Sequence, residues 1–342
     1  MKRLLLLALF ASPAPWLAAQ SGQAVIDRSQ QPAPPSLPSD PSAGTAISPG
    51  DADTGNQRIA EPRTLPFKLS LGYDLQVYHT ANVNLAPSGQ PAADAVIVAN
   101  TLALRADFSS HALGDGVLTP SAGLTYQRYY HGVGTNDHGN LDFDAYTVPL
   151  SLRYRFGDNW DATLGFSASS VYSLEGPPKY HLIYRAYSPS ISVRKLVALA
   201  PDHIVALGAG LSYSKTTADR DSVIILTPFR EDRNDKCDLS TDVAYYYLRD
   251  KWTFSPYVRL TYSDYLHYQE NSALPAPAPA VDVDRRDLTG SVGLSVTYNF
   301  TRWASARAFT SFDWRESLGD DAFDYGYDNT NVGLGLSLTA SF

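Results

Sequence analysis

The sequence predicts an all-β fold, an up-and-down antiparallel barrel of about twelve strands that crosses a membrane. From residue 67 to residue 342, apolar side chains alternate with small or polar ones, and alternation with period two gives a strand one apolar face. Short and long connections also alternate along this region, and aromatic residues gather where the segments end. The three patterns together indicate strands that have hydrocarbon on one side and water on the other.

The N-terminus predicts export. Lys2 and Arg3 precede an apolar run at residues 4–10, and the small residues Ala18 and Ala19 follow. This order is typical of a cleaved secretory signal, which we place at residues 1–19. The run is shorter than the roughly 20 apolar residues that a membrane-spanning helix needs. Any crossing of the membrane is therefore expected to use strands.

Residues 20–66 are expected to form a disordered periplasmic segment ahead of the barrel at residues 67–342. The segment is rich in Pro, Ser, Ala, Gly and Asp and has no apolar periodicity. Such a composition buries too little apolar surface to offset the entropy of ordering. A plug or a peptidoglycan-binding role would be expected to bring aromatic or charged motifs, and the Pro-rich run at residues 31–35 has none.

The connections predict which strand ends share a side of the membrane. Tight connections lie at residues 157–159, 200–202, 249–251 and 299–302, with a moderate one at 110–116. Long connections lie at residues 79–94, 131–141, 174–182, 215–237, 267–285 and 315–329. In barrels of this kind the tight turns face the periplasm and the long loops face outward, so both ends of the barrel domain are expected on the periplasmic side. Pro149 and Pro189 fall in mid-strand, where the missing N–H predicts bulges or register shifts.

The final strand shows the alternation most clearly. Its apolar face consists of Val332, Leu334, Leu336, Leu338, Ala340 and Phe342. The residues between them are mainly Gly, Ser and Thr, which are too small to build a packed protein core.

Aromatic residues are sorted into two belts, as expected where strands cross two membrane interfaces. Near the tight turns lie Phe67, Phe108, Phe156, Trp160, Tyr247, Trp252, Phe254, Phe300, Trp303 and Phe342. Near the long loops lie Tyr126, Tyr146, Tyr172, Tyr187, Tyr213, Tyr262 and Trp314. A soluble β-sandwich would share the alternation but would have no reason to sort its aromatic residues in this way.

The opposite face is expected to be mostly Gly, Ser, Thr and Ala, which would leave a lumen that holds water unless a loop or the N-terminal segment folds in. Charged residues predicted to point into that lumen are Asp74, Arg105, Asp107, Arg153, Arg155, Arg194, Asp242, Arg259, Asp287, Arg307 and Asp313. One interpretation makes the arginines a constriction that binds or steers anionic solutes, because guanidinium grips carboxylate or phosphate with two parallel bonds. The other pairs them with the aspartates to stiffen the wall.

The sequence favours no catalytic, cofactor or metal site. No His is followed two residues later by Ser, the arrangement used by some lipid-acting barrels. Acidic groups at residues 219–221 and 320–324 fall in loops, and the charged stretch at 231–235 lacks the Gly and the spacing of a calcium loop. Cys237 is alone and makes no internal disulfide. The net charge of −8 argues against nucleic-acid binding, which requires a concentrated basic surface.

From residue 67 to its end the chain resembles the bacterial outer-membrane β-barrel superfamily, and it is porin-like in its repeated hairpins, aromatic belts and terminal Phe342. The resemblance implies an outer-membrane location, contact with lipid and lipopolysaccharide, and insertion by the barrel-assembly machinery with Phe342 as assembly signal. It also implies passage of small hydrophilic solutes, with anionic solutes as one option. The alternatives are a closed structural or surface-recognition barrel that acts through its extracellular loops, and an outer-membrane lipid hydrolase or protease. An alanine stripe at residues 304, 306 and 308 predicts either a subunit contact or a thin spot in the lipid-facing band.

Overall fold

The computed structural model describes residues 25, 27–29, 66–86, 91–132, 141–174, 180–218, 231–267, 269–270, 281–282, 284–319 and 326–342. The predicted signal at 1–19, most of the 20–66 segment and the acidic groups at 219–221 and 320–324 lie outside this part of the chain. Within it, no helix has the length and apolar character needed to span a membrane.

The described chain is built almost wholly of strands. They are β1 (Phe67–Thr80), β2 (Ala95–Phe108), β3 (His111–Leu113), β4 (Gly116–His131), β5 (Phe143–Phe156), β6 (Trp160–Ser173), β7 (His181–Ala200), β8 (His203–Ala218), β9 (Lys236–Arg249), β10 (Trp252–Tyr265), β11 (Gln269–Glu270), β12 (Val281–Asp282), β13 (Arg286–Thr301), β14 (Ala304–Ser317) and β15 (Tyr327–Ser341).

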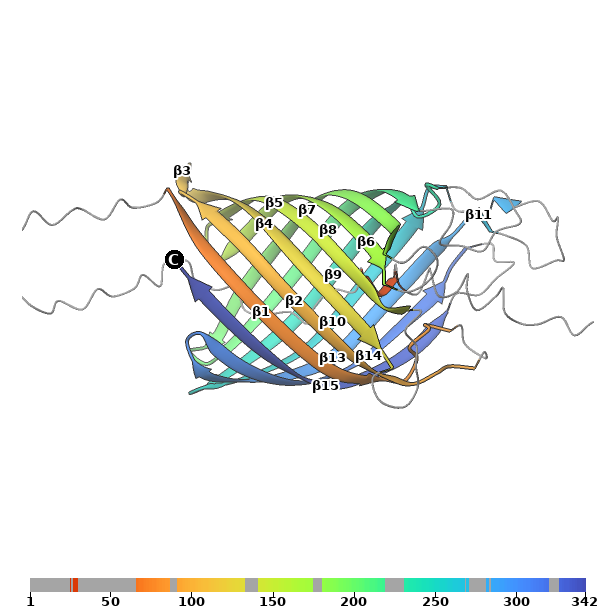
Figure 1. Cartoon of the computed structure of the whole chain (residues 1–342). Coiled ribbons are helices and arrows are strands. Elements are labelled where there is room, and N and C mark those ends of the chain that lie inside the picture. Colours follow the sequence, from red (N-terminus) through yellow and green to blue (C-terminus); the bar gives the residue numbers. More distant parts are fainter. Residues whose placement is uncertain are drawn as a thin grey trace, which may run out of the picture.

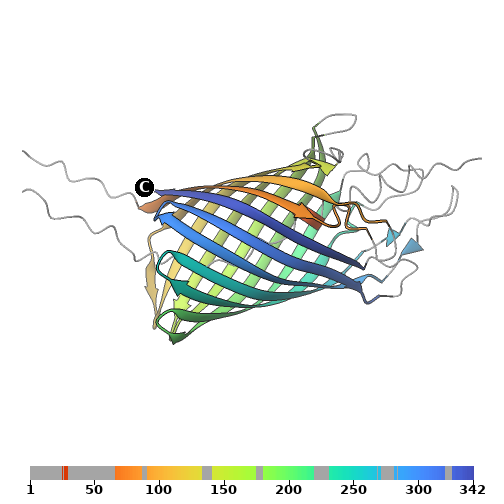
Figure 2. The ribbon, with the colours of Figure 1, turned by 90° about the horizontal axis from the view of Figure 1, so that it is seen from below.

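Twelve long strands close into a barrel, as the sequence predicts (Figure 1). Every long strand pairs antiparallel with its neighbours along the chain. The ring closes where β1 pairs with β15, in unbroken register from Ser70 opposite Ser341 to Thr80 opposite Asn331. Strands cross the wall obliquely, and Figure 2 shows β1 and β15 side by side. Because the ring is closed, the long strands leave no unpaired edge.

The two ends of the barrel differ. We call the end with the tight connections the turn end, and the end with the long connections the loop end. β5 and β6 are joined by a three-residue turn in which Gly157 and Asn159 have φ of 48° and 61°, a left-handed conformation that Gly and Asn adopt at low cost. Phe67 and Phe342 both lie at the turn end, so the barrel begins and ends on one side as predicted.

Three short strands add to the predicted set. β3 extends the moderate connection after β2 and pairs with the first residues of β4. β11 and β12 pair with each other within the long connection between β10 and β13. The alternation of large apolar residues does not reveal these strands, because β3 has three exposed residues and β11 and β12 have two residues each, too few to show a period of two.

The predicted register shifts at the mid-strand prolines are wrong. Pro149 lies opposite Ser167 and Pro189 lies opposite Phe166, and both pairs fall within continuous register between β5, β6 and β7. The pairing with the strand on the other side is interrupted at each proline, but its register is the same before and after the gap. The β4–β5 pairing resumes at Thr125 opposite Thr147, and the β7–β8 pairing resumes at Ser190 opposite Ser212. A proline lacks one donor only, so the ladder on one side loses two residue pairs while the ladder on the other side keeps the strand in place.

The outer face is apolar and exposed, which a soluble protein would not tolerate over such an area. Leu164 is 57% exposed and Leu334 is 66% exposed, and similar residues recur on every long strand. At the turn end, Trp252 packs on Tyr298 with ring centroids 4.7 Å apart. At the loop end, Tyr126 packs on Tyr146 at 5.1 Å. The two aromatic belts are therefore present as predicted.

The inner face carries more large side chains than the sequence pattern predicts. One buried cluster at the loop end includes Phe143, Ile97 and Tyr184, with Tyr78 and Tyr129 packed against it. A second cluster includes Tyr246 and Tyr257, with Leu196 and Ile204 packed against it. These aromatic residues occupy inward positions among small residues, so the lumen is narrower than a wall of Gly, Ser and Thr would make it.

Candidate functional site in the barrel lumen

The charged residues predicted to line the lumen occupy the inward positions of their strands, opposite in parity to the exposed apolar residues. They do not form a ring of separate cations. Around the wall, arginine and aspartate side chains alternate and contact each other.

The strongest of these contacts joins β5 to β6 near the turn end. Arg153 donates two parallel hydrogen bonds to Asp161, with Nε to Oδ1 at 2.9 Å and Nη2 to Oδ2 at 2.7 Å. Arg155 lies 3.5 Å from the same carboxylate. Asp161 is buried, and it was not among the predicted lumen residues. A bidentate geometry fixes both side chains against the wall.

A second contact spans three strands. Arg194 on β7 lies 3.6 Å from Asp242 on β9, across Gly208 on β8. Arg259 on β10 stands opposite Asp242 in register. A Cβ at Gly208 would lie 2.3 Å from Asp242 Oδ1, so the glycine makes room for the carboxylate.

The remaining predicted residues are also engaged. Arg307 lies 3.6 Å from Asp74, and Arg105 donates to Asp107 at 2.7 Å. Asp313 has no ion pair at comparable distance among the described contacts. It accepts hydrogen bonds from Ser291 at 2.5 Å, Asn331 at 2.6 Å and Ser311 at 3.2 Å. Of the two interpretations of the arginines, these contacts favour the stiffened wall.

The N-terminal segment contributes a turn of helix inside the lumen, which we call the N-terminal turn: Val25 and residues 27–29. For these residues the expectation of a disordered periplasmic segment does not hold, and the adjacent charges of Asp27 and Arg28 contact the inner wall of the barrel. Val25 is buried within the loop-end cluster of β2, β5, β6 and β7. Asp27 contacts β14 on the other side of the barrel. A segment that touches both sides of the ring must lie in the lumen.

Two charged side chains hold the N-terminal turn. Arg28, only 2% exposed, donates from Nη2 to the Asn82 carbonyl oxygen at 2.7 Å and from Nε to the Val83 carbonyl oxygen at 2.9 Å. Asp27 forms an ion pair with Arg315 at 2.8 Å, with each side chain 9% exposed. The turn is therefore fixed between the end of β1 and the end of β14.

The wall around Asp27 is rich in cations. Arg285 donates from Nη2 to Asp287 at 2.6 Å, and Arg315 Nε lies 3.7 Å from the same carboxylate. On β9, Lys236 forms an ion pair with Asp238 at 3.1 Å. Asp287 lies close to both the Arg285 and the Arg315 guanidinium groups, and Asp27 supplies a second carboxylate to Arg315.

Sequence reasoning missed Asp27, Arg28 and Arg315 as functional residues. A weak signal existed, because Asp27 and Arg28 are the only adjacent pair of opposite charges within residues 20–66. Their partners are more than fifty residues away in the chain, so only the closed barrel brings them together.

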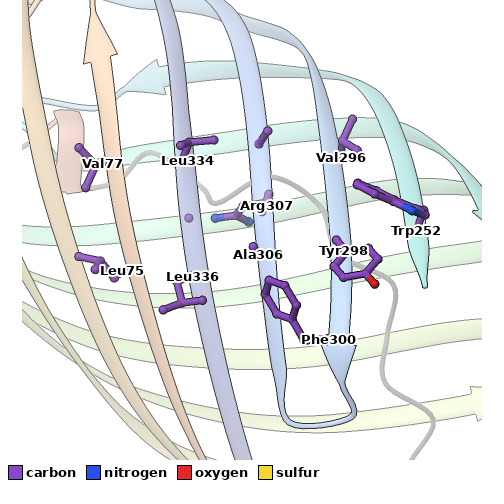
Figure 3. Close-up of a pocket in the computed structure, with 12 residues that line it drawn as sticks. Leu75, Val77, Trp252, Val296, Tyr298, Phe300, Ala306, Arg307, Leu334 and Leu336 are labelled. Carbon is purple, nitrogen blue, oxygen red and sulfur yellow. The ribbon is translucent and has the colours of Figure 1, made fainter.

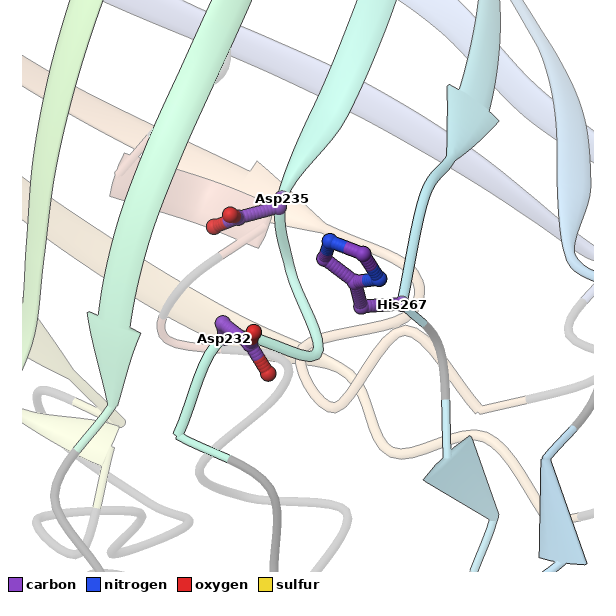
Figure 4. Close-up of side chains that lie close together, drawn as sticks. All are labelled: Asp232, Asp235 and His267. Carbon is purple, nitrogen blue, oxygen red and sulfur yellow. The ribbon is translucent and has the colours of Figure 1, made fainter.

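Asp232, Asp235 and His267 meet at the loop end, with one possible ligand atom of each within 4.8 Å of the others (Figure 4). The buried Asp235 accepts hydrogen bonds from the Thr216 backbone N–H at 2.6 Å and hydroxyl at 2.9 Å. The Leu266 N–H donates to the Asp235 carbonyl oxygen at 2.9 Å. These bonds explain the position of Asp235 as a tie between the ends of β8, β9 and β10.

The outer surface carries a groove of about 630 Å³ above β14 (Figure 3). Its floor is formed by Ala306 and Ala308, and rows of larger side chains flank it, among them Leu334 and Tyr298. The alanine stripe is thus hollowed on its outer side, and the two interpretations, a subunit contact and a thin spot in the lipid-facing band, both stay predictions.

Comparisons with known proteins return barrels. No family model matches the chain, and no curated protein sequence matches it. Among solved structures, the COG4313 outer membrane channel from Pseudomonas putida F1 has 12% identity and a TM-score of 0.48, covering 84% of this chain and 100% of its own. The β domain of the Bordetella autotransporter BrkA has 11% identity and a TM-score of 0.41, covering 78% and 98%. The NanC porin has 11% identity and a TM-score of 0.38, covering 78% and 98%.

Likenesses at these identities and scores assign no activity, and the architecture rests on the strand pairing itself. Closed pairing, an apolar outer face between two aromatic belts and a charged inner face make this chain a closed antiparallel β-barrel suited to span a membrane.

Proposed function

We propose that this protein is a porin-like channel for small hydrophilic solutes, closed at its loop end by the N-terminal turn in the conformation described. The observation that supports a channel is the inner wall, where charged and hydroxyl side chains are held flat against the strands by contacts with each other. Asp161 with Arg153, and Ser121 with Ser151 at 2.7 Å, are examples. A wall whose polar groups are paired along its own surface leaves the axis free for water.

The paired charges also bear on selectivity. Arg153, Arg194 and Arg307 each lie beside a carboxylate, so the field along the axis is weaker than a ring of separate arginines would give. The channel is therefore proposed to pass hydrophilic solutes with weak preference for anions. Exclusion of enzymatic activity, contact with lipopolysaccharide, and insertion by the barrel-assembly machinery stay predictions.

Electrical recording across planar lipid bilayers tests the channel. The full chain is expected to give rare or small current steps, and the Asp27→Ala/Arg28→Ala variant larger and more frequent ones, because the turn loses its ion pair and both hydrogen bonds.

Faster migration of the unheated protein on gels serves as the control for a folded barrel. If that variant folds and both proteins stay silent, the channel proposal is wrong. If both conduct equally, the N-terminal turn does not close the lumen.

A further inference from the structure

We propose that the seat of the N-terminal turn is a solute-binding site for molecules that carry a carboxylate close to a guanidinium or ammonium group. Asp27 and Arg28 occupy this seat as a tethered ligand. The inference rests on the proposed channel function for its physiological meaning, because a solute must enter the lumen to reach the seat.

The cation half of the seat is built before any ligand arrives. The carbonyl oxygens of Asn82 and Val83 accept hydrogen bonds from Arg28, and bonds that do not involve Arg28 also hold this stretch, among them the Val83 N–H to the Ala93 carbonyl oxygen at 2.7 Å. The Asn82 side chain donates to the Ala86 carbonyl oxygen at 3.0 Å and accepts from the Ala86 N–H at 2.8 Å. The Asn82 N–H donates to Asn329 Oδ1 on β15 at 3.0 Å. Two neighbouring carbonyl oxygens on a stretch that these bonds hold form a preorganised acceptor pair for a planar cation.

Other groups reinforce that half. Tyr78 on β1 and Asp313 on β14 both lie within electrostatic reach of Arg28. Tyr78 lies over Gly333 of β15. A Cβ at Gly333 would lie 2.2 Å from the Tyr78 Cβ, so the glycine leaves space for the Tyr78 side chain. A cation placed between the two carbonyl oxygens would therefore also interact with the Asp313 carboxylate on β14, two strands away from β1.

The anion half is the guanidinium of Arg315. Its Nη2 lies 2.8 Å from Asp27, and its guanidinium group lies over the Tyr327 ring at 4.9 Å. Arg285 also lies close to Asp287, so two wall guanidinium groups share that carboxylate. Burying a cation is costly unless a carboxylate accompanies it. When Asp27 leaves, Arg315 favours another carboxylate in its place.

The described contacts of the N-terminal turn include two charged ones, the Asp27 ion pair and the Arg28 hydrogen bonds, which a free solute with the same two groups can reproduce. An isolated helical turn of this length is unstable in water, so the turn keeps its shape through the contacts of Val25, Asp27 and Arg28. A group tethered to the barrel competes with a free solute at the effective concentration that the tether sets. A free solute with the same two groups would need a similar concentration to displace it, whereas a chain without the tethered pair would bind at lower concentrations.

Titration calorimetry in detergent tests the seat without requiring conduction. The protein is the Asp27→Ala/Arg28→Ala variant, and the probes are a capped peptide of residues 25–29 and the same peptide with Asn and Gln in place of the charged residues. The charged peptide is expected to bind about tenfold or more tightly than the neutral one, because it restores two charge-assisted contacts.

Adding Arg315→Gln to the variant should remove that preference. Adding Arg286→Gln should leave it unchanged, because Arg286 is an exposed arginine at the same end that pairs with Asp284 at 2.7 Å. Free L-arginine, a smaller molecule with the same two groups, should compete with the charged peptide.

Equal binding of both peptides, or an undiminished preference after Arg315→Gln in a folded barrel, would overturn the proposal. Charged-peptide binding in a barrel that never conducts would support the seat and contradict the channel. Conduction by a barrel that binds both peptides equally would support the channel and contradict the seat.

Discussion

At the scale of single residues, the inner-face glycines give space to particular neighbours. Gly208 lies beneath Asp242, and a Cβ there would meet the carboxylate at 2.3 Å. Gly208→Ala is therefore expected to displace Asp242 from Arg194 and to lower the free energy of unfolding by about 1–3 kcal/mol. Equilibrium unfolding in detergent, followed by tryptophan fluorescence, measures the change.

Gly72→Ala is the matched control for that substitution. Gly72 also points inward from a long strand, but a Cβ there meets nothing nearer than backbone oxygens at 4.0 Å. Its effect is expected to stay within about 0.5 kcal/mol. An equal decrease in the free energy of unfolding for Gly208→Ala and Gly72→Ala would contradict the prediction, because it would mean that displacing Asp242 has no energetic cost.

At the scale of elements, each long strand has two faces in different solvents, and adjacent residues experience opposite environments. Leu150 lies outward in the middle of β5, whereas Ser151 points inward and bonds Ser121 at 2.7 Å. Leu150→Arg is expected to cost about 2–4 kcal/mol, because it places a charge near the bilayer midplane. Ser151→Arg is expected to cost about 0.5–1.5 kcal/mol for the lost hydrogen bond.

Unfolding in lipid vesicles compares these two variants under one condition. A larger loss for Ser151→Arg than for Leu150→Arg would contradict the assignment of the faces. The same comparison would fail to discriminate if β5 were packed between two protein layers.

Element boundaries and facing follow from sequence because a strand's side-chain direction is fixed by its period of two. The predicted tight turns, the belts and the inward arginines are all local consequences of that period. The predicted shifts at Pro149 and Pro189 failed for a non-local reason. A strand in a closed ring has two partners, and the intact ladder on one side preserves the register that the other side interrupts.

At the scale of the whole molecule, the last residue takes part in closing the barrel together with the last strand. The Phe342 N–H donates to the Leu69 carbonyl oxygen at 2.8 Å, and the Leu69 N–H donates to the Phe342 carbonyl oxygen at 3.2 Å. Deleting Phe342 removes both hydrogen bonds, and each loss is expected to lower the free energy of unfolding by about 0.5–1.5 kcal/mol. The remaining pairs between β1 and β15 are expected to keep the barrel closed. The purified deletion variant should therefore refold to a heat-modifiable barrel.

In cells the same deletion is expected to reduce the amount of inserted barrel much more strongly, because Phe342 is predicted to serve as the assembly signal. Membrane fractionation with immunoblotting measures this amount. Phe300→Ala is the control, since Phe300 is another exposed aromatic residue at the turn end. Equal amounts of the deletion variant and the full chain would contradict the signal role, and equal reductions by both variants would indicate a general need for aromatic residues at that end.

The sequence by itself determined that this chain forms about twelve alternating strands, which face is apolar, and which charges point inward, because these properties depend on neighbours one or two residues away. Only the tertiary structure decided what those charges do. Arg194 meets Asp242 across an intervening strand, and Arg28 meets the carbonyl oxygens of Asn82 and Val83 from more than fifty residues away. Such contacts depend on the ring closing and on its curvature, which bring together side chains that no local pattern connects.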